Sequence, residues 1–286
     1  KADQHSLFYE AYQGEWVGFE AEFQYTDGAV IRLNEMDLPE EFQDWGTVPT
    51  GYECTNSTTL RTDILYRKMF RVLPSISPLG ELIDVEEETY TMDVHSKAFA
   101  AFRDGSFAHG LEKVDVESPM YLSPRKLEFG LVNPNKPEEQ RIVARFGFHL
   151  GSLMFNTNPK VILESFETDY SGGQYVVGTS GFTEGWGAAK ILDGKDVQGE
   201  WKQISSGVQV CRPMLQQIDK QSLLFPEGIS LQIRGQVSED GQEEYCIVEL
   251  GWIPDIKTGK RSVMSQTYNK KTGDIISTHY DVETKI

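Results

Sequence analysis

The chain has 286 residues, of which 39% are hydrophobic and 11% aromatic, and its formal net charge is −17 at pH 7. This length suffices for one large or two ordinary domains with packed cores. The negative charge excludes an electrostatic grip on nucleic acid or on an anionic membrane surface. No run of about 18 apolar residues is present, so no transmembrane segment is predicted.

Cysteine and histidine spacing favours neither a disulfide framework nor a metal site. The three cysteines, Cys54, Cys211 and Cys246, include no Cys-x-x-Cys pair and do not form an even set. The five histidines lack the close spacings typical of metal ligands. The chain also lacks a Gly-x-Ser-x-Gly nucleophile motif and a phosphate-binding loop. We therefore predict no metal site and assign no catalytic residue.

The strongest structural signal in the chain is strict alternation from Val17 to Tyr25. One face carries Val17, Phe19, Ala21, Phe23 and Tyr25, and the other carries Gly18, Glu20, Glu22 and Gln24. A period of two predicts a β-strand with one buried and one solvated face. We expect the aromatic face to point into a small antiparallel barrel, with Trp16 closing one end of that barrel.

Short strands and turns follow along the remaining chain. Between residues 60 and 166, strand-like segments are separated by turn residues at the spacing of an all-β barrel or sandwich. Ser171-Gly172-Gly173 is the best candidate linker. We therefore predict a first unit over residues 1–170, with an N-terminal lead-in, and a second, smaller β unit over residues 171–286.

Landmarks of the first unit recur in the second. The matching pairs are Gly105 with Gly228 in similar turns, Gly130 with Gly251 in similar strands, and Arg141 with Arg261 at the start of hairpins. The members of each pair are 120 to 123 residues apart. A near-constant separation suggests a duplicated unit, and chance similarity between turns is the alternative.

Motifs of the C-terminal third resemble a known family. Phe225-Pro226-Glu227-Gly228, the strand from Tyr245 to Trp252, and the hairpin from Arg261 through Gly273 resemble the closing part of the DUF3598 family. Gly14-Glu15-Trp16 and Asp104-Gly105-Ser106 are similar to the family's opening strand and mid-barrel turn. The resemblance implies two tandem lipocalin-like (calycin) antiparallel β-barrels and an origin in cyanobacteria or plastids. It implies no established reaction.

The chain departs from the family pattern between Gly178 and Ile218, which predicts a second barrel that is shortened or open. In calycins an arginine from a late strand packs over the opening tryptophan, as a cation–π contact. Arg145 is the nearest candidate partner of Trp16, and the alternative is that Arg145 faces solvent. In the second unit, Trp252 with Arg261 is the analogous pair.

Three functions remain open. We expect a non-catalytic protein that binds a hydrophobic small molecule, such as a tetrapyrrole, a carotenoid or a fatty-acid derivative, in a photosynthetic organism. The alternatives are an accessory subunit docking on a photosynthetic complex, and a pigment-modifying enzyme or chromophore lyase. The expected ligand-binding residues are Trp16, Phe19, Phe23, Tyr25, Tyr66, Phe70, Tyr90, Phe129, Arg145 and Phe146, with Trp252 and Arg261 in the second unit. A filled core without a cavity is the alternative for the aromatic residues.

The family's origin suggests the chloroplast, in the stroma or near the thylakoid, or the cyanobacterial cytoplasm. The chain begins at Lys1 and shows no targeting peptide, which leaves its location open. A bound pigment or lipid is the cofactor class that these expectations allow.

Overall fold

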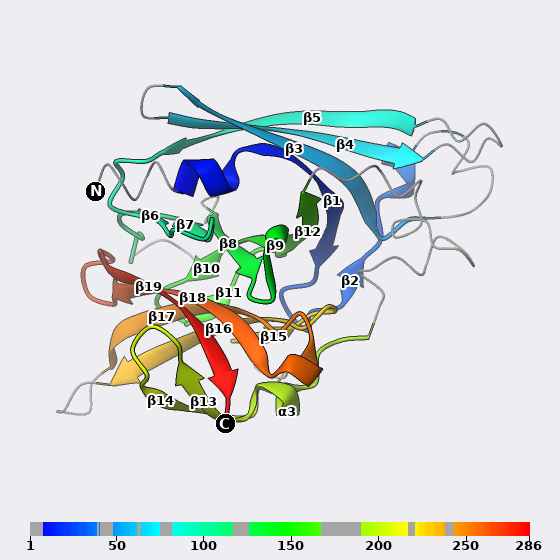
Figure 1. The fold of residues 1–286 in the computed structure, drawn as a ribbon. Helices are drawn as coiled ribbons and strands as arrows, with labels where there is room; N and C mark the ends of the chain where they lie inside the picture. The colour runs from blue at the N-terminus through cyan, green and yellow to red at the C-terminus, as the bar shows by residue number, and fades with distance from the viewer. Residues whose placement is uncertain are drawn as a thin grey trace.

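The computed structural model describes residues 8–38, 40, 48–61, 64–74, 82–116, 126–166, 190–216, 221–237 and 243–286. Two large antiparallel sheets make up most of this part of the chain (Figure 1). A short helix over residues 8–12 precedes the first sheet, and α3 (Gly194–Val197) precedes the second.

The first sheet has ten strands: β1 (Gly14–Phe23), β2 (Val30–Ile31), β3 (Gly51–Arg61), β4 (Ile64–Pro74), β5 (Leu82–Asp93), β6 (Phe99–Ala101), β7 (Phe107–His109), β8 (Leu127–Asn133), β9 (Lys136–Phe146) and β12 (Lys160–Phe166). The second has seven: β13 (Gly199–Gln203), β14 (Gln209–Arg212), β15 (Ser222–Leu224), β16 (Ile229–Val237), β17 (Glu243–Trp252), β18 (Lys260–Asn269) and β19 (Ile275–Lys285). The remaining elements are the hairpin of β10 (Phe148–His149) with β11 (Met154–Phe155), and the 3-10 turns η1 (Glu35–Asp37) and η3 (Ile256–Thr258).

The two sheets share one strand order. The first runs β5-β4-β3-β1-β12-β9-β8-β7-β6, and the second runs β14-β13-β19-β18-β17-β16-β15. The opening strands β1 and β13 occupy equivalent positions. On one side of them, β12-β9-β8-β7-β6 corresponds to β19-β18-β17-β16-β15, and on the other side β3 corresponds to β14. The described part of the second sheet has no counterpart of β4 and β5. The fold is therefore all-β with two tandem barrel units, the first nearly closed and the second open, as predicted.

Each unit opens with the same three residues. Gly14-Glu15-Trp16 begins β1, and Gly199-Glu200-Trp201 begins β13. Both glycines have left-handed backbone angles, with φ of 101° and 121°, which a residue with a side chain adopts only under strain. This shared entry supports the duplication that the landmark spacing suggests.

The first sheet curls around the polar face of β1, which its sequence pattern predicted to be solvated. Arg67 on β4 reaches Glu128 on β8, and Arg145 on β9 reaches Tyr90 on β5. These strands are not neighbours in the sheet, so their side chains meet only across the barrel interior. The prediction of an aromatic interior is therefore wrong. Alternation distinguishes two faces of a strand, but it does not say which of them a curled sheet encloses.

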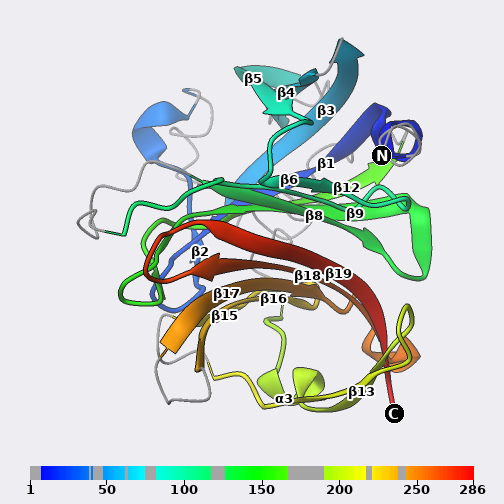
Figure 2. The ribbon, with the colours of Figure 1, turned by 90° about the vertical axis from the view of Figure 1, so that its left-hand side faces the viewer.

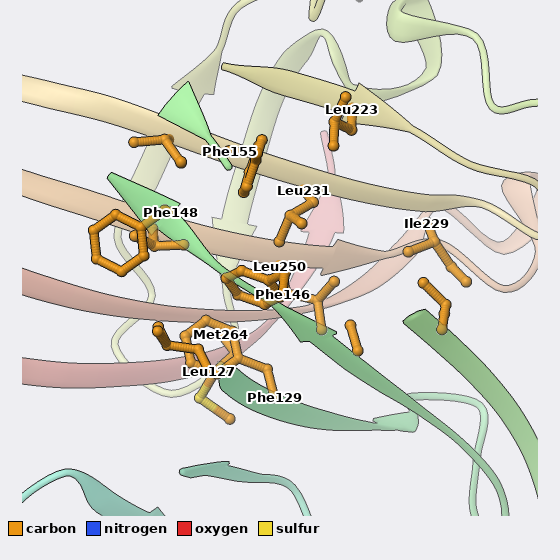
Figure 3. Packing of buried hydrophobic residues seen from close by; sticks show 14 of the residues in the cluster. Leu127, Phe129, Phe146, Phe148, Phe155, Leu223, Ile229, Leu231, Leu250 and Met264 are labelled. Carbon is orange, nitrogen blue, oxygen red and sulfur yellow. The ribbon is translucent and has the colours of Figure 1, made fainter. Parts of the chain in front are cut away.

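The aromatic face of the first sheet is buried against the second sheet. Figure 3 shows the buried side chains of this shared core, among them Phe129 and Phe146 from the first unit and Leu231, Leu250 and Met264 from the second. Figure 2 shows the two sheets stacked, with β8 and β9 next to β18 and β19. The two units thus lie back to back and cover each other's apolar faces, as sheet-on-sheet packing requires.

Polar contacts also join the units. The Ser262 hydroxyl donates to the carbonyl of Val132 at 2.9 Å, and the Gln266 amide donates to the carbonyl of Ala98 at 3.1 Å. The predicted boundary between residues 170 and 171 lies outside the described residues. The shared core contains residues from both sides of this boundary.

Candidate functional site

A cavity of about 240 Å³ lies inside the first barrel, away from the Trp16 end. Side chains on β4, β5, β7, β8, β9 and β12 form its wall, together with Lys126 just before β8. The lining residues are Arg71, Glu88, Tyr90, Thr91, Met92, His109, Lys126, Glu128, Arg145 and Lys160. Most of the wall is therefore polar or charged, because the sheet encloses the face that carries the Arg and Glu residues.

Glu128 anchors one side of the wall. Its carboxylate accepts hydrogen bonds from Arg67 and, at 2.7 Å, from Nε of Arg145. Arg67 is fully buried and also donates to the Tyr12 hydroxyl at 3.0 Å. Burial raises the pKa of Glu128, but the charges of Arg67 and Arg145 outweigh burial and bring it to about 2. Glu128 is therefore ionised at every physiological pH.

Arg71 anchors the other side. Its Nε and Nη2 donate to the two oxygens of Glu20 at 2.8 and 3.0 Å, which is the paired geometry that suits guanidinium and carboxylate. Its Nη1 donates to Glu88 at 2.9 Å. Burial lowers the pKa of Arg71, but its contacts with Glu20 raise the pKa by more than burial lowers it. Arg71 therefore stays charged. Both anchors hold fixed charges in place before any ligand arrives.

An arginine–tyrosine stack lies between the anchors. The guanidinium of Arg145 lies 3.8 Å from the ring centre of Tyr90 and donates to the Tyr90 hydroxyl. Burial raises the pKa of Tyr90 to about 12, so the phenol is neutral at pH 7. Burial lowers the pKa of His109, so its ring is neutral there as well. The stack presents a flat surface next to the charged wall.

Two lysines lie at the cavity mouth. Nζ of Lys160 is 3.9 Å from Glu20 and 3.8 Å from Glu22, and one third of the Lys160 side chain is exposed. Lys126 is exposed, and no ion pair joins it to another residue in the described ranges. These ammonium groups are thus less firmly engaged than the arginines of the wall.

Arg141, not Arg145, packs over Trp16. Its guanidinium lies 3.9 Å from the Trp16 ring and 4.3 Å from the Tyr12 ring, and Nε donates to Glu164 on the neighbouring strand. The expected pairing of Arg145 with Trp16 is therefore wrong. Arg141 and Arg145 are four residues apart on β9 and therefore share a face of this strand. Arg145 lies too far along the strand to reach the end where Trp16 is.

The second unit repeats this arrangement with Trp201. Arg261 lies 4.9 Å from the Trp201 ring, and its Nε donates to Glu283 at 2.7 Å. The expected partner, Trp252, instead lies in the shared core and donates to the carbonyl of Glu227 at 3.0 Å. The pairing of Arg261 with Trp252 is therefore wrong. The recurring Gly-Glu-Trp triplet was the signal that identifies Trp201.

Of the aromatic residues predicted to bind a ligand, only Tyr90 reaches the cavity. Phe23, Phe129 and Phe146 are fully buried in the shared core, and Phe19 and Tyr25 pack against it. Tyr66 and Phe70 lie on the other face of β4, where they contact Arg61 and Lys68. The charged residues that line the cavity were missed. Their signal was the run of Arg and Glu on the second face of strand after strand.

Two further hollows among the described residues can be compared with this cavity. One of about 640 Å³ lies beside Trp16, and its wall reaches Phe166, the last described residue before the gap at 167–189. The other, of about 210 Å³, lies on the concave side of the second sheet beside Arg212 and Glu249. The hollow of the second sheet is also crossed by an ion pair between distant strands, from Arg212 on β14 to Glu249 on β17. The cavity in the first barrel differs from it in having two lysines, Lys126 and Lys160, in its lining.

Comparison with known proteins identifies the fold and no activity. No protein-family model and no curated protein match this sequence. The structure is similar to the crystal structure of a DUF3598 family protein of unknown function from Nostoc punctiforme PCC 73102, with a TM-score of 0.55 over 98% of both chains and 14% sequence identity. The resemblance to DUF3598 is thus confirmed at the level of the fold.

The described residues contain neither a membrane-spanning helix nor a metal site. No helix among them is long and apolar enough to cross a bilayer. Within the same ranges, no group of three or more metal-ligating side chains converges. The three cysteines are free, with Cys54 and Cys246 buried and Cys211 exposed.

Proposed function

We propose that this protein binds a small molecule in the cavity of its first barrel, without transforming it. The observation that carries the proposal is the cavity wall, where Arg71 and Arg145 are fixed by carboxylates from other strands. Buried ion pairs add little net stability compared with apolar packing, because desolvation offsets their attraction. A wall of such pairs around a cavity supports a recognition role, since a ligand meets polar groups that are already oriented.

The wall also narrows the ligand classes considered from the sequence. The cavity has a volume of about 240 Å³, which is below the roughly 300 Å³ at which pockets for drug-sized ligands begin. A carotenoid is long and carries no charge, so it matches neither the size nor the wall. Of the expected classes, tetrapyrroles and fatty acids carry a carboxylate that suits Arg and Lys, and a shorter acid suits the volume better. A photosynthetic host, in its chloroplast or cyanobacterial cytoplasm, remains part of this proposal.

An enzyme is the second candidate, because Glu88 and Tyr90 lie together in the cavity. Tyr90 has a pKa of about 12, since burial raises it, and such a phenol is a weak acid at pH 7. Burial raises the pKa of Glu88, but the hydrogen bonds of Tyr90 and Arg71 lower it, so Glu88 stays ionised. Both groups are held in the form that binds rather than in a form poised to exchange protons, which favours binding.

The test is a fragment titration of the full chain followed by NMR. Resonances of the His109 and Tyr90 rings report on the cavity, and those of the Trp201 ring report on the second unit. We expect ligands to shift the first two and leave Trp201 unchanged. Arg145→Met should abolish those shifts, and circular dichroism of this variant checks that it remains folded. A fragment and metabolite set that shifts neither ring would refute the proposal.

A further inference from the structure

We propose that the ligand of this cavity is a small anion, a carboxylate or a phosphate, bound between Lys126 and Lys160 at the mouth and Arg145 on the wall. This inference rests on the proposed function, because it assigns the chemical class of the ligand at the same cavity.

The arginines around the cavity are matched by carboxylates. Arg67 and Arg145 share Glu128, and Arg71 is bound by Glu20 and Glu88. Three arginines thus face three carboxylates.

The two lysines remain outside this balance. Lys160 approaches Glu20 and Glu22 only at 3.9 and 3.8 Å, beyond the usual range of a direct hydrogen bond. Lys126 has no ion pair among the described residues. Glu22 offsets part of the charge of Lys160, whereas Lys126 adds a positive charge that no described carboxylate pairs with, in a chain whose formal net charge is −17.

A buried donor also lacks an acceptor. Arg145 is 6% exposed, and its Nη2 has no hydrogen-bond partner. Its Nε and Nη1 already donate to Glu128 and Tyr90. Leaving a buried charged donor unpaired is unfavourable, because the group has lost its hydration without gaining an acceptor. Other buried arginines, such as Arg67 and Arg141, also have an unpartnered Nη2, but of these three only Arg145 lines the cavity, so an anion there would lie beside its guanidinium.

Protonation does not remove the surplus. Glu128 is already ionised, and Tyr90 and His109 are both neutral at pH 7, for the reasons of burial and charge given above. The distant acidic residues of the surface act weakly, because the Debye length is about 8 Å at physiological salt. An entering anion therefore experiences the lysines and Arg145, together with the nearby carboxylates of Glu22 and Glu88.

The experiment titrates the full chain with benzoate, inorganic phosphate and the neutral isostere benzamide. Dissociation constants come from calorimetry, and the His109 ring resonance shows whether binding occurs in the cavity. Benzoate tests a carboxylate whose ring can lie on the stack of Arg145 and Tyr90, and phosphate tests a compact anion. We expect at least one of the two anions to bind at least tenfold more tightly than benzamide.

The variants are Lys126→Met and Lys160→Met, with Lys136→Met as the matched control. Lys136 is exposed on the β8–β9 hairpin and pairs only with Glu139 among the described residues. We expect each mouth variant to weaken the preferred anion about three- to tenfold, and the control to leave it unchanged. Because all three lysines are at least one third exposed, these variants should remain folded.

The outcomes separate the two claims. If benzamide binds as tightly as the anions, or if other fragments shift the His109 ring and neither anion does, the anion inference is wrong and the binding proposal stands. If the mouth variants bind the preferred anion as the control does, the assignment to the lysines is wrong. If nothing tested shifts the His109 ring, both claims fail.

Discussion

Replacing Glu128 by glutamine tests whether the barrel interior is held by buried charge. The substitution keeps the shape of the side chain but leaves Arg67 and Arg145 without their shared carboxylate. Removing one partner of a buried ion pair costs about 3–5 kcal/mol, because the remaining charge is buried and unpaired. The pKa of Glu128 gives a second figure. Its fall from 4.5 to about 2 on folding corresponds to about 3 kcal/mol of stability.

The pH dependence has a defined sign. Because the pKa of Glu128 is lower in the folded state, its contribution is complete above about pH 4.5 and is lost as the pH falls toward 2. Urea unfolding at pH 7 and at pH 3 measures this contribution. We expect Glu128→Gln to lower the free energy of unfolding at pH 7 by about 3 kcal/mol, and to lose less stability than the wild type between the two pH values.

Glu139→Gln is the control, since Glu139 lies on an exposed hairpin with 65% of its side chain in solvent. It should change stability by no more than about 0.5 kcal/mol. If Glu128→Gln also stays within that range and follows the wild-type pH profile, the interior is not held together by this ion pair, and the account of the wall is wrong.

Three further predictions concern the two units. Phe129→Ala should lower the free energy of unfolding, measured with urea, by about 3–5 kcal/mol, because it leaves a cavity in the shared core. A loss below about 1 kcal/mol would show that Phe129 is not packed in that core. Residues 1–170 and 171–286 expressed separately should each lack cooperative thermal unfolding, since each exposes its half of that core; a sharp transition in either would show independent domains. Arg261→Met should change the fluorescence of Trp201 and leave ligand affinity in the first barrel unchanged, and altered affinity would place the cavity elsewhere.

The sequence predicted the strands and their alternation, but not the direction in which the sheet curls. Phe23 and Glu20 lie on opposite faces of β1, as predicted, yet Glu20 points into the barrel and Phe23 toward the second unit. One strand considered alone favours an aromatic interior. The correct assignment requires knowing that the aromatic face has another sheet to cover it, and that information lies in a distant part of the chain.

The candidate site follows the same pattern. The sequence indicated an arginine over Trp16, but the choice between Arg141 and Arg145 depends on how far each lies along β9. The duplicated landmarks were found at a separation of about 120 residues. Trp201 was not recognised as the counterpart of Trp16, because it follows Trp16 at a longer separation. The opening strand of the first unit precedes β3, β4 and β5, whereas among the described residues that of the second precedes β14 and then β15.

The most direct test of the account is NMR of the arginine Nε–H groups with benzoate and phosphate added to the full chain. We expect slowly exchanging signals for Arg71, Arg141, Arg145 and Arg261, since each Nε donates to a buried carboxylate. On addition of the anion that binds, the signals of Arg71 and Arg145 should move, and those of Arg141 and Arg261 should not. Rapid exchange at all four would contradict the charged interior, and an anion that moves Arg141 and Arg261 alone would contradict the cavity.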